Sequence, residues 1–317
     1  MINFLFSINV TFPIFLVMVI GYFLRRIGML NENFVTVCNK LNFKVTLPFL
    51  VFRDLANVDI RAEFDLKFVL FCAFATSVGF FAAWFIGKHF LKDPYTVGAF
   101  TQASFRSSAA VMGMAFIQQI YGSSAMGALM IVGAVPLYNI YSVIVLTLEG
   151  NNPDMGKGAE KVKQTLLNII KNPIIIGVLL GIVVGLLRNP MPTLVNSTVD
   201  LVAKTATPLA LIALGAGFQG RKAIKKIRPT IGASVYKLVI QAAIFIPIAA
   251  AMGFRGEKMV AIVIMLAAPA TPSCYIMAKN MNNDGTLTAS IVVATTLLAS
   301  VTLTAWIFIV KTLGWIG

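Results

Sequence analysis

Residues 266–274 read LAAPATPSC, and residues 101–108 read TQASFRSS. Each stretch interrupts a long apolar segment near its middle. Pro269 and Pro272 each lack a backbone donor and clash with the preceding turn, so a regular helix is expected to break there. The other stretch has polar side chains at six of its eight positions, one of them Arg106. We therefore predict two broken helices inside a bundle of apolar helices.

The rest of the chain is too apolar for a soluble protein. Of its 317 residues, 58% are hydrophobic and 12% are charged, whereas a soluble domain has roughly 25% charged residues. This composition argues against a soluble enzyme. The net charge of +14 arises mostly from the gaps between apolar segments, where Lys and Arg set membrane topology. A nucleic-acid-binding protein is therefore not expected, and a multi-span membrane protein is.

Ten membrane-spanning helices are predicted. A spanning helix needs about 20 mostly apolar residues. Extending each apolar run to its flanking charges gives segments near 5–28, 33–55, 66–90, 94–120, 124–149, 167–188, 193–219, 229–253, 258–281 and 285–313. With the N-terminus outside, the inside gaps hold 14 Lys and Arg residues and the outside gaps hold 7. This bias predicts that both ends of the chain face outside.

The two halves of the chain match when one is shifted by 160 residues. Four pairs of identical residues share this shift: Pro13 and Pro173, Gly21 and Gly181, Lys44 and Lys204, and Pro48 and Pro208. The chain then divides into a five-helix repeat at 1–149, a cytoplasmic linker at 150–166 and a second repeat at 167–317. Because five is odd, the second repeat is inverted in the membrane. Inverted repeats are typical of secondary transporters.

The two interrupted segments are the fourth helix of each repeat. Irregular backbone survives at membrane depth only where protein or water satisfies its polar groups. Matching interruptions in two repeats indicate a transporter's binding site, and half-helix N-termini would direct partial positive charge into it. The alternative is that both breaks are packing kinks in a tight bundle.

Polar residues at the two breaks are the candidate site. An arginine at the bilayer centre costs at least about 2.5–3.5 kcal/mol, so Arg106 needs a partner. It could bind a substrate carboxylate or neutralise the carbonyl ends of the broken helices. Ser107, Ser108, Thr271 and Ser273 could donate to the same carboxylate or cap the half-helices.

Charges inside the other segments indicate the sign of the charge that the substrate carries. Asp200 and Lys204 lie four residues apart on one helical face and can form an ion pair, although Asp200 could also carry a proton or a cation. The cations well inside the predicted spans, away from the span ends, are Lys40, Lys44, Arg106, Lys204 and Lys237. Asp200 is the acid that lies well inside a span. Because the spans hold five such cations against this acid, we expect an anionic substrate.

The chain resembles the auxin efflux carrier family of transporters, which includes plant carriers and bacterial permeases. The resembling stretches are TFPIFLVMVIGYFLRRIGML (11–30), KVTLPFLVF (44–52), ASFRSSAAVMGMAF (103–116), TPLALIALGAGF (207–218) and LAAPATPSCYIMAKNM (266–281). The resemblance implies ten helices in a fold similar to NhaA-type antiporters, with the fourth and ninth helices crossing. It also implies organic-anion substrates and places Tyr141 beside the substrate path. Arg106 and Ser108 lie in the region where plant carriers of the family have Pro-Asn.

Residues and resemblance together predict a secondary transporter or facilitator that moves small carboxylates, such as malate, malonate or auxin-like acids, by alternating access. We expect it in a bacterial plasma membrane, in contact with lipid and in a possible homodimer. The alternatives are a sodium- or proton-coupled antiporter of the same fold and a membrane anion sensor that does not transport. No enzyme motif, cofactor site or metal-ligand spacing is recognised.

Overall fold

The computed structural model describes residues 2–57, 65–109, 117, 125–150, 166–187 and 191–316. Within these ranges the regular elements are all helices, and their bounds follow. They are α1 (Ile2–Arg26), α2 (Glu32–Leu41), η1 (Asn42–Thr46), α3 (Leu47–Ala56), α4 (Leu66–Phe90), α5 (Pro94–Phe105), α7 (Ala125–Glu149), α9 (Pro173–Leu187), α10 (Thr193–Gly217), α11 (Gly220–Lys225), α12 (Ile227–Val235), η2 (Tyr236–Ile240), α13 (Gln241–Ala251), α14 (Gly256–Ala267), α15 (Ser273–Asn280) and α16 (Gly285–Thr312).

Five helices in the described part of the chain are long and apolar enough to cross a membrane. They are Leu66–Phe90, Met126–Glu149, Thr193–Gly217, Ile227–Ala251 and Gly285–Thr312. The described part of the chain is thus all-helical and holds several membrane-span candidates, as the composition predicts. The predicted linker at 150–166 and the second half of the segment at 94–120 lie almost entirely outside the described residues.

Several helices begin at an Asn or Asp whose side chain accepts a hydrogen bond from the first turn. Asn31 accepts from the backbone N–H of Phe34 at the start of α2. Asp65 caps α4 in the same way, and Asp284 caps α16. Because these short side chains satisfy N–H groups that have no partner within the helix, they fix where each helix starts.

A π-helical turn, η1, lies directly before Pro48 in the second predicted segment. Proline has no N–H to offer the carbonyl of Lys44, four residues earlier. The backbone N–H of Leu47 bonds instead to the carbonyl of Asn42, five residues back. The Asn42 side chain donates to the carbonyl of Ala206 in α10 at 3.0 Å, which ties this turn to the neighbouring helix.

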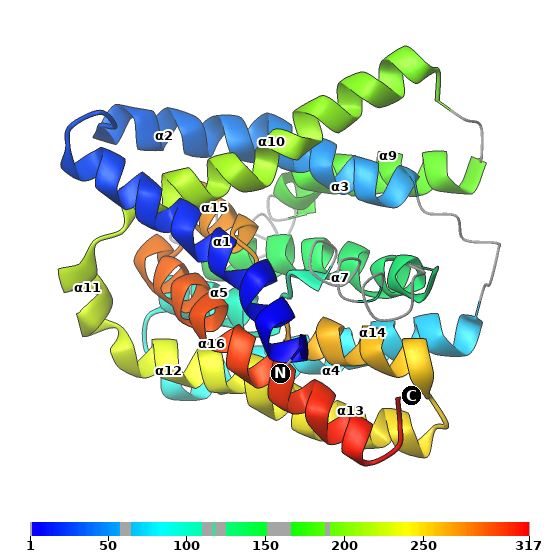
Figure 1. Ribbon diagram of the computed structural model, residues 1–317. Coiled ribbons are helices and arrows are strands. Elements are labelled where there is room, and N and C mark those ends of the chain that lie inside the picture. Colours follow the sequence, from blue (N-terminus) through cyan, green and yellow to red (C-terminus); the bar gives the residue numbers. More distant parts are fainter. Residues whose placement is uncertain are drawn as a thin grey trace.

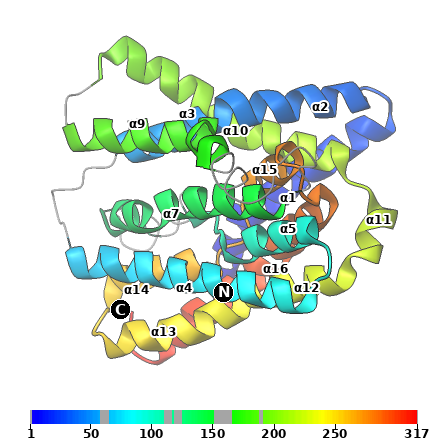
Figure 2. The ribbon, with the colours of Figure 1, turned by 180° about the vertical axis from the view of Figure 1, so that it is seen from behind.

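The helices are arranged with the interrupted ones on the inside. In Figures 1 and 2, α2, α3, α9 and α10 lie along one side of the molecule, and α4, α12 and α13 lie along the opposite side. Between these sides run α5, α7 and α15. Helix α1 packs against both α10 and α16. The broken segments therefore lie at the centre of the bundle, where side chains of both sides can reach them.

Two helix pairs, α1 with α10 and α3 with α9, pack backbone against backbone. A Cβ on Gly21 would collide with the carbonyl oxygen of Ile212, and one on Gly181 would lie 2.9 Å from that of Phe52. The shift of 160 residues that pairs Gly21 with Gly181 also pairs Phe52 with Ile212. The two contacts therefore correspond under the shift that the sequence suggests.

Candidate functional site

The two sequence interruptions contact each other through the backbone. Helix α5 ends at Phe105 and α14 ends at Ala267, and both are 12 residues long. The residue after each helix is extended, with φ −75° and ψ 130° at Arg106 and φ −67° and ψ 152° at Ala268. The backbone N–H of Ser108 donates to the carbonyl of Pro269 at 2.9 Å. A backbone N–H left without a helical partner at the first break thus satisfies a backbone carbonyl at the second break.

A small cavity of about 60 Å³ lies against this meeting point. Side chains of α3, α7 and α10 close it together with residues of both breaks. Its polar lining consists of Asp54, Arg106, Ser107, Ser108, Tyr138, Asn139, Thr207, Thr271 and Ser273. Five of the residues that the sequence singled out for substrate contact therefore share one cavity. Its volume is far below the roughly 300–1,000 Å³ typical of drug-sized ligands, which suits a small ion.

Two larger hollows in the described part of the molecule have a different chemistry. One, of about 320 Å³, lies among α1, α10 and α16, and the other, of about 360 Å³, lies among α3, α9 and α10. Their linings are mainly aliphatic and aromatic side chains such as Phe15, Leu214 and Ile176. Neither gathers several polar groups on one point, so the small polar cavity is the better site for a charged ligand.

Arg106 is the positive charge of the cavity. Its side chain is buried, with 6% of its surface exposed. One terminal nitrogen donates to Oδ1 of Asn139 at 2.9 Å, and the other lies 2.9 Å from Sδ of Met277 and 3.5 Å from Oγ of Ser142. These partners are neutral, and no acid of the described residues forms an ion pair with it. The charge is therefore uncompensated and keeps N–H groups to offer a ligand.

A second buried cation, Lys237, caps the broken helix α14. Its side chain is fully buried in η2. Its ammonium donates to the carbonyl of Leu266 at 2.8 Å and to Oε1 of Gln241 at 3.4 Å. Leu266 belongs to the last turn of α14, whose carbonyls have no partner within the helix. Lys237 thus takes the structural role that the sequence left open for Arg106.

The hydroxyl residues of the two breaks divide between structure and cavity. The Ser107 hydroxyl donates to the carbonyl of Ala268 at 3.3 Å. Thr271 and Ser273 contact each other, with their hydroxyl oxygens 3.2 Å apart, and both line the cavity. Ser273 is also the first residue of α15, which no side chain caps. The start of this half-helix therefore adds partial positive charge beside Arg106.

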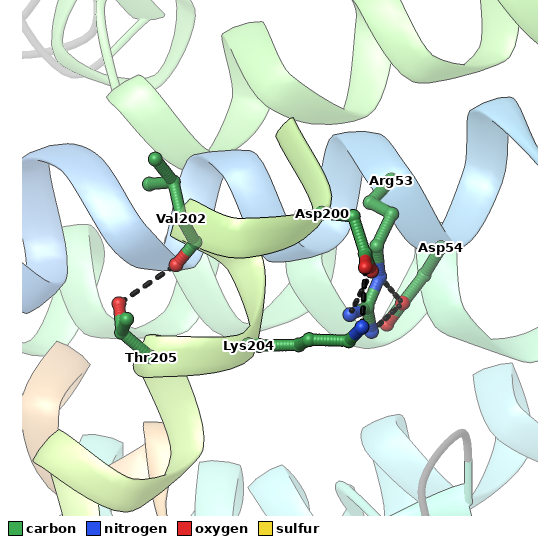
Figure 3. Close-up of polar contacts among 6 residues, drawn as sticks. All are labelled: Arg53, Asp54, Asp200, Val202, Lys204 and Thr205. Atoms are coloured by element: carbon green, nitrogen blue, oxygen red, sulfur yellow. Dashed lines mark hydrogen bonds and ion pairs between the residues drawn. The ribbon is translucent and has the colours of Figure 1, made fainter. Parts of the chain in front are cut away.

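An acid that the sequence reasoning passed over, Asp54, also lines the cavity. It lies near the end of α3, and its side chain is 14% exposed. Figure 3 shows its carboxylate beside the guanidinium of Arg53, at 2.8 Å from Nη2 and 3.2 Å from Nε. In the sequence Asp54 reads as a charge at the end of a segment. Its position beside the cavity depends on how α3 packs against α7.

Asp200 and Lys204 form the ion pair that their spacing suggested, away from the cavity. Oδ2 of Asp200 lies 2.5 Å from Nζ of Lys204, and Oδ1 lies 3.4 Å from Nη1 of Arg53 (Figure 3). Lys204 is 66% exposed, and neither residue lines the cavity. The same view shows the Thr205 hydroxyl bonded to the carbonyl of Val202 within α10.

Tyr141 stands one helical turn away from the cavity-lining part of α7. Its ring stacks on Phe80, with centroids 4.5 Å apart, and its hydroxyl lies 3.0 Å from that of Ser77. Tyr138 lines the cavity instead and donates to the carbonyl of Met265 at 3.3 Å. The suggested contact of Tyr141 with substrate stays a prediction.

Comparison with known proteins gives the family. A family model described as a membrane transport protein matches residues 6–307. An uncharacterized transporter of Escherichia coli K12, YfdV, is 25% identical over 310 residues, which cover 96% of this chain and 98% of that protein. An uncharacterized transporter of Methanothermobacter thermautotrophicus is 21% identical over 307 residues, with 96% and 98% covered. The chain belongs to this membrane transporter family, the auxin efflux carrier family.

Proposed function

We propose that this transporter carries small organic anions and binds their carboxylate in the cavity between the two broken helices. The observation that carries the proposal is Arg106, a buried guanidinium in the cavity whose partners among the described residues are all neutral. A planar carboxylate can accept two parallel hydrogen bonds from such a group. The Thr271 and Ser273 hydroxyls and the start of α15 are further donors beside it.

The charge of the site favours an anion over a cation. A sodium or proton antiporter would need a free carboxylate near the breaks. Asp200, the candidate for that role, is held by both Arg53 and Lys204 outside the cavity. Asp54 lines the cavity but is paired with Arg53. Arg106 has no such partner in the described part of the chain, so an anion is the ligand that would compensate the buried charge.

Alternating access through an inverted repeat is the mechanism we infer. Its support is the correspondence of the two halves, with the repeats at 1–149 and 167–317. The shift of 160 residues relates the Gly21 and Gly181 contacts, and the two 12-residue half-helices end at breaks that touch. In such a carrier the two repeats rock around a site at their interface, near the membrane midplane. We infer ten spans, an NhaA-like crossing and a plasma membrane location with both termini outside.

Flux into proteoliposomes tests this function. Purified protein is reconstituted, and uptake of radiolabelled propionate and malonate is compared for the wild type, Arg106→Gln and Arg26→Gln. Arg26 is the matched control because it contacts Tyr22 and lies outside the cavity. We expect propionate uptake by the wild type and the control and its loss in Arg106→Gln. Equal uptake by Arg106→Gln would overturn the site, and binding without uptake would indicate a sensor.

A further inference from the structure

The charged side chains around the cavity do not balance. Asp54 and Arg106 are the charged residues that line it within the described part of the chain. The undescribed residues that follow the first break, 110–116 and 118–124, carry no charge in the sequence. The cation partner of Asp54 is Arg53 and not Arg106, because two nitrogens of Arg53 donate to its Oδ1. Arg106 has only neutral partners.

The ion pairs behind Asp54 link four charged residues of the described chain. Arg53 lies between Asp54 and Asp200, and Asp200 also binds Lys204 (Figure 3). Two cations and two acids thus cancel. Of the charged residues that line the cavity in the described part of the chain, Arg106 is the one without an ion-pair partner. One negative charge on a ligand neutralises it, and a second would have no cation to meet.

We propose that Asp54 is a specificity-determining residue that restricts the substrate to anions with a single negative charge. This inference rests on the proposed function, since it narrows the substrate class of the same site. Monocarboxylates fit directly. A dicarboxylate fits only when one of its carboxyl groups, or Asp54 itself, is protonated.

The size of the cavity makes the rejection of a second charge effective. Arg106 and Asp54 both line this cavity of about 60 Å³, so a second carboxylate on a ligand held by Arg106 would share the same small space with Asp54. Like charges a few ångströms apart repel strongly when little water separates them. The neutral groups on the remaining lining, such as Tyr138 and Asn139, cannot offset that repulsion. Exclusion of a wrong ligand by a like charge is an established route to specificity.

Three probes separate charge from size, because one monoanion is smaller than malonate and the other is larger. Propionate and monomethyl malonate carry one negative charge at neutral pH, and malonate carries two. Their dissociation constants are measured by calorimetry on the purified full-length protein. We expect the wild type to prefer both monoanions to malonate by at least about tenfold. This measurement needs no variant, so it stands even if a substitution disturbs folding.

Two substitutions then locate the charge that discriminates. Asp54→Asn and Asp200→Asn each remove one acid from the same group of ion pairs, but only Asp54 lines the cavity. We expect Asp54→Asn to shift the malonate-to-propionate ratio toward malonate by about tenfold or more, and Asp200→Asn to leave it within about twofold.

The outcomes that contradict the inference differ from those that contradict the function. If the wild type binds malonate at neutral pH as tightly as propionate, the single-charge rule is wrong. If the malonate-to-propionate ratio is unchanged in folded Asp54→Asn, or shifts equally in Asp200→Asn, then Asp54 does not determine the specificity. If no probe binds the wild type, the proposed function itself fails.

Discussion

The glycine-lined helix contacts and the contact between the two breaks are built on opposite principles. Where α1 meets α10, and α3 meets α9, glycines let backbone touch backbone, and no polar side chain is needed. Where the breaks meet, the backbone is left open, and the Ser107 hydroxyl, the Ser108 backbone N–H and the Lys237 ammonium donate to its carbonyls. Small-residue contacts favour close, stable packing in membranes, whereas buried polar groups in membrane segments mark function. The glycine contacts hold the helices together, and the contact between the breaks presents the residues that we propose bind the substrate.

Filling one of the close contacts gives the largest expected effect. A Cβ on Gly215 of α10 would meet the carbonyl of Met18 in α1, and a backbone neighbour cannot move aside cheaply. We expect Gly215→Leu to cost more than about 3 kcal/mol, beyond the usual range for an overpacked side chain, and to abolish folded protein. Size-exclusion chromatography with thermal melting measures it. Gly220→Ala is the control, because nothing lies within 4 Å of its added Cβ.

The corresponding change at the breaks alters binding and leaves the fold intact. Arg106→Lys keeps the charge but loses the planar fork that can hold a carboxylate at two points. We expect propionate binding to weaken by about 1.5–3 kcal/mol, that is about tenfold or more, with an unchanged melting temperature. A folded Arg106→Lys that binds propionate as tightly as the wild type would show that the fork is not used.

A smaller effect is expected at the end of α14. Lys237→Met keeps the length of the side chain but removes the donor to the Leu266 carbonyl, which leaves a buried acceptor unsatisfied. We expect a loss of about 1–3 kcal/mol of stability. Thermal melting in detergent measures it, with Lys204→Met as the control on an exposed lysine. A rise in stability would mean that burying the ammonium costs more than its hydrogen bonds return.

The smallest effect lies outside the membrane segments, at Asp65. Two hydrogen bonds hold the pKa of this carboxyl below its usual value. The larger effect comes from the Lys258 ammonium and the smaller from the backbone N–H of Phe68. Because the folded-state pKa is depressed, the contribution to stability is present above the unfolded pKa of about 3.9 and is lost as the pH falls through the folded-state pKa. Melting curves should show a slightly smaller acid loss in Asp65→Asn than in the wild type. Identical acid profiles would contradict a role for this ion pair.

The sequence was most informative at prolines and at charges within apolar runs, because few structures tolerate such residues inside a membrane helix. Pro269 and Pro272 located the break before α15, and Arg106 located the end of α5. The long apolar runs predicted the helices because each run ends at a charge or a capping residue. These signals are local, so no knowledge of packing was needed to read them.

Contacts that depend on packing between distant helices were not predictable. Asp54 comes near the end of its segment, and only the placement of α3 against α7 brings it to the cavity. The bonds from Lys237 to Leu266 and from Arg106 to Asn139 join residues 29 and 33 positions apart. Tyr141 and Tyr138 lie one turn apart, and only the rotation of α7 decides which of them lines the cavity.

The most direct test of the central claim is to locate a bound anion. Bromopropionate is soaked into crystals of the full-length protein, and its bromine is found by anomalous scattering. We predict one strong peak in the small polar cavity, with the carboxylate within hydrogen-bonding distance of the Arg106 guanidinium and the Thr271 and Ser273 hydroxyls. A peak in either apolar hollow, with the polar cavity empty, would contradict the assignment of this cavity as the anion site.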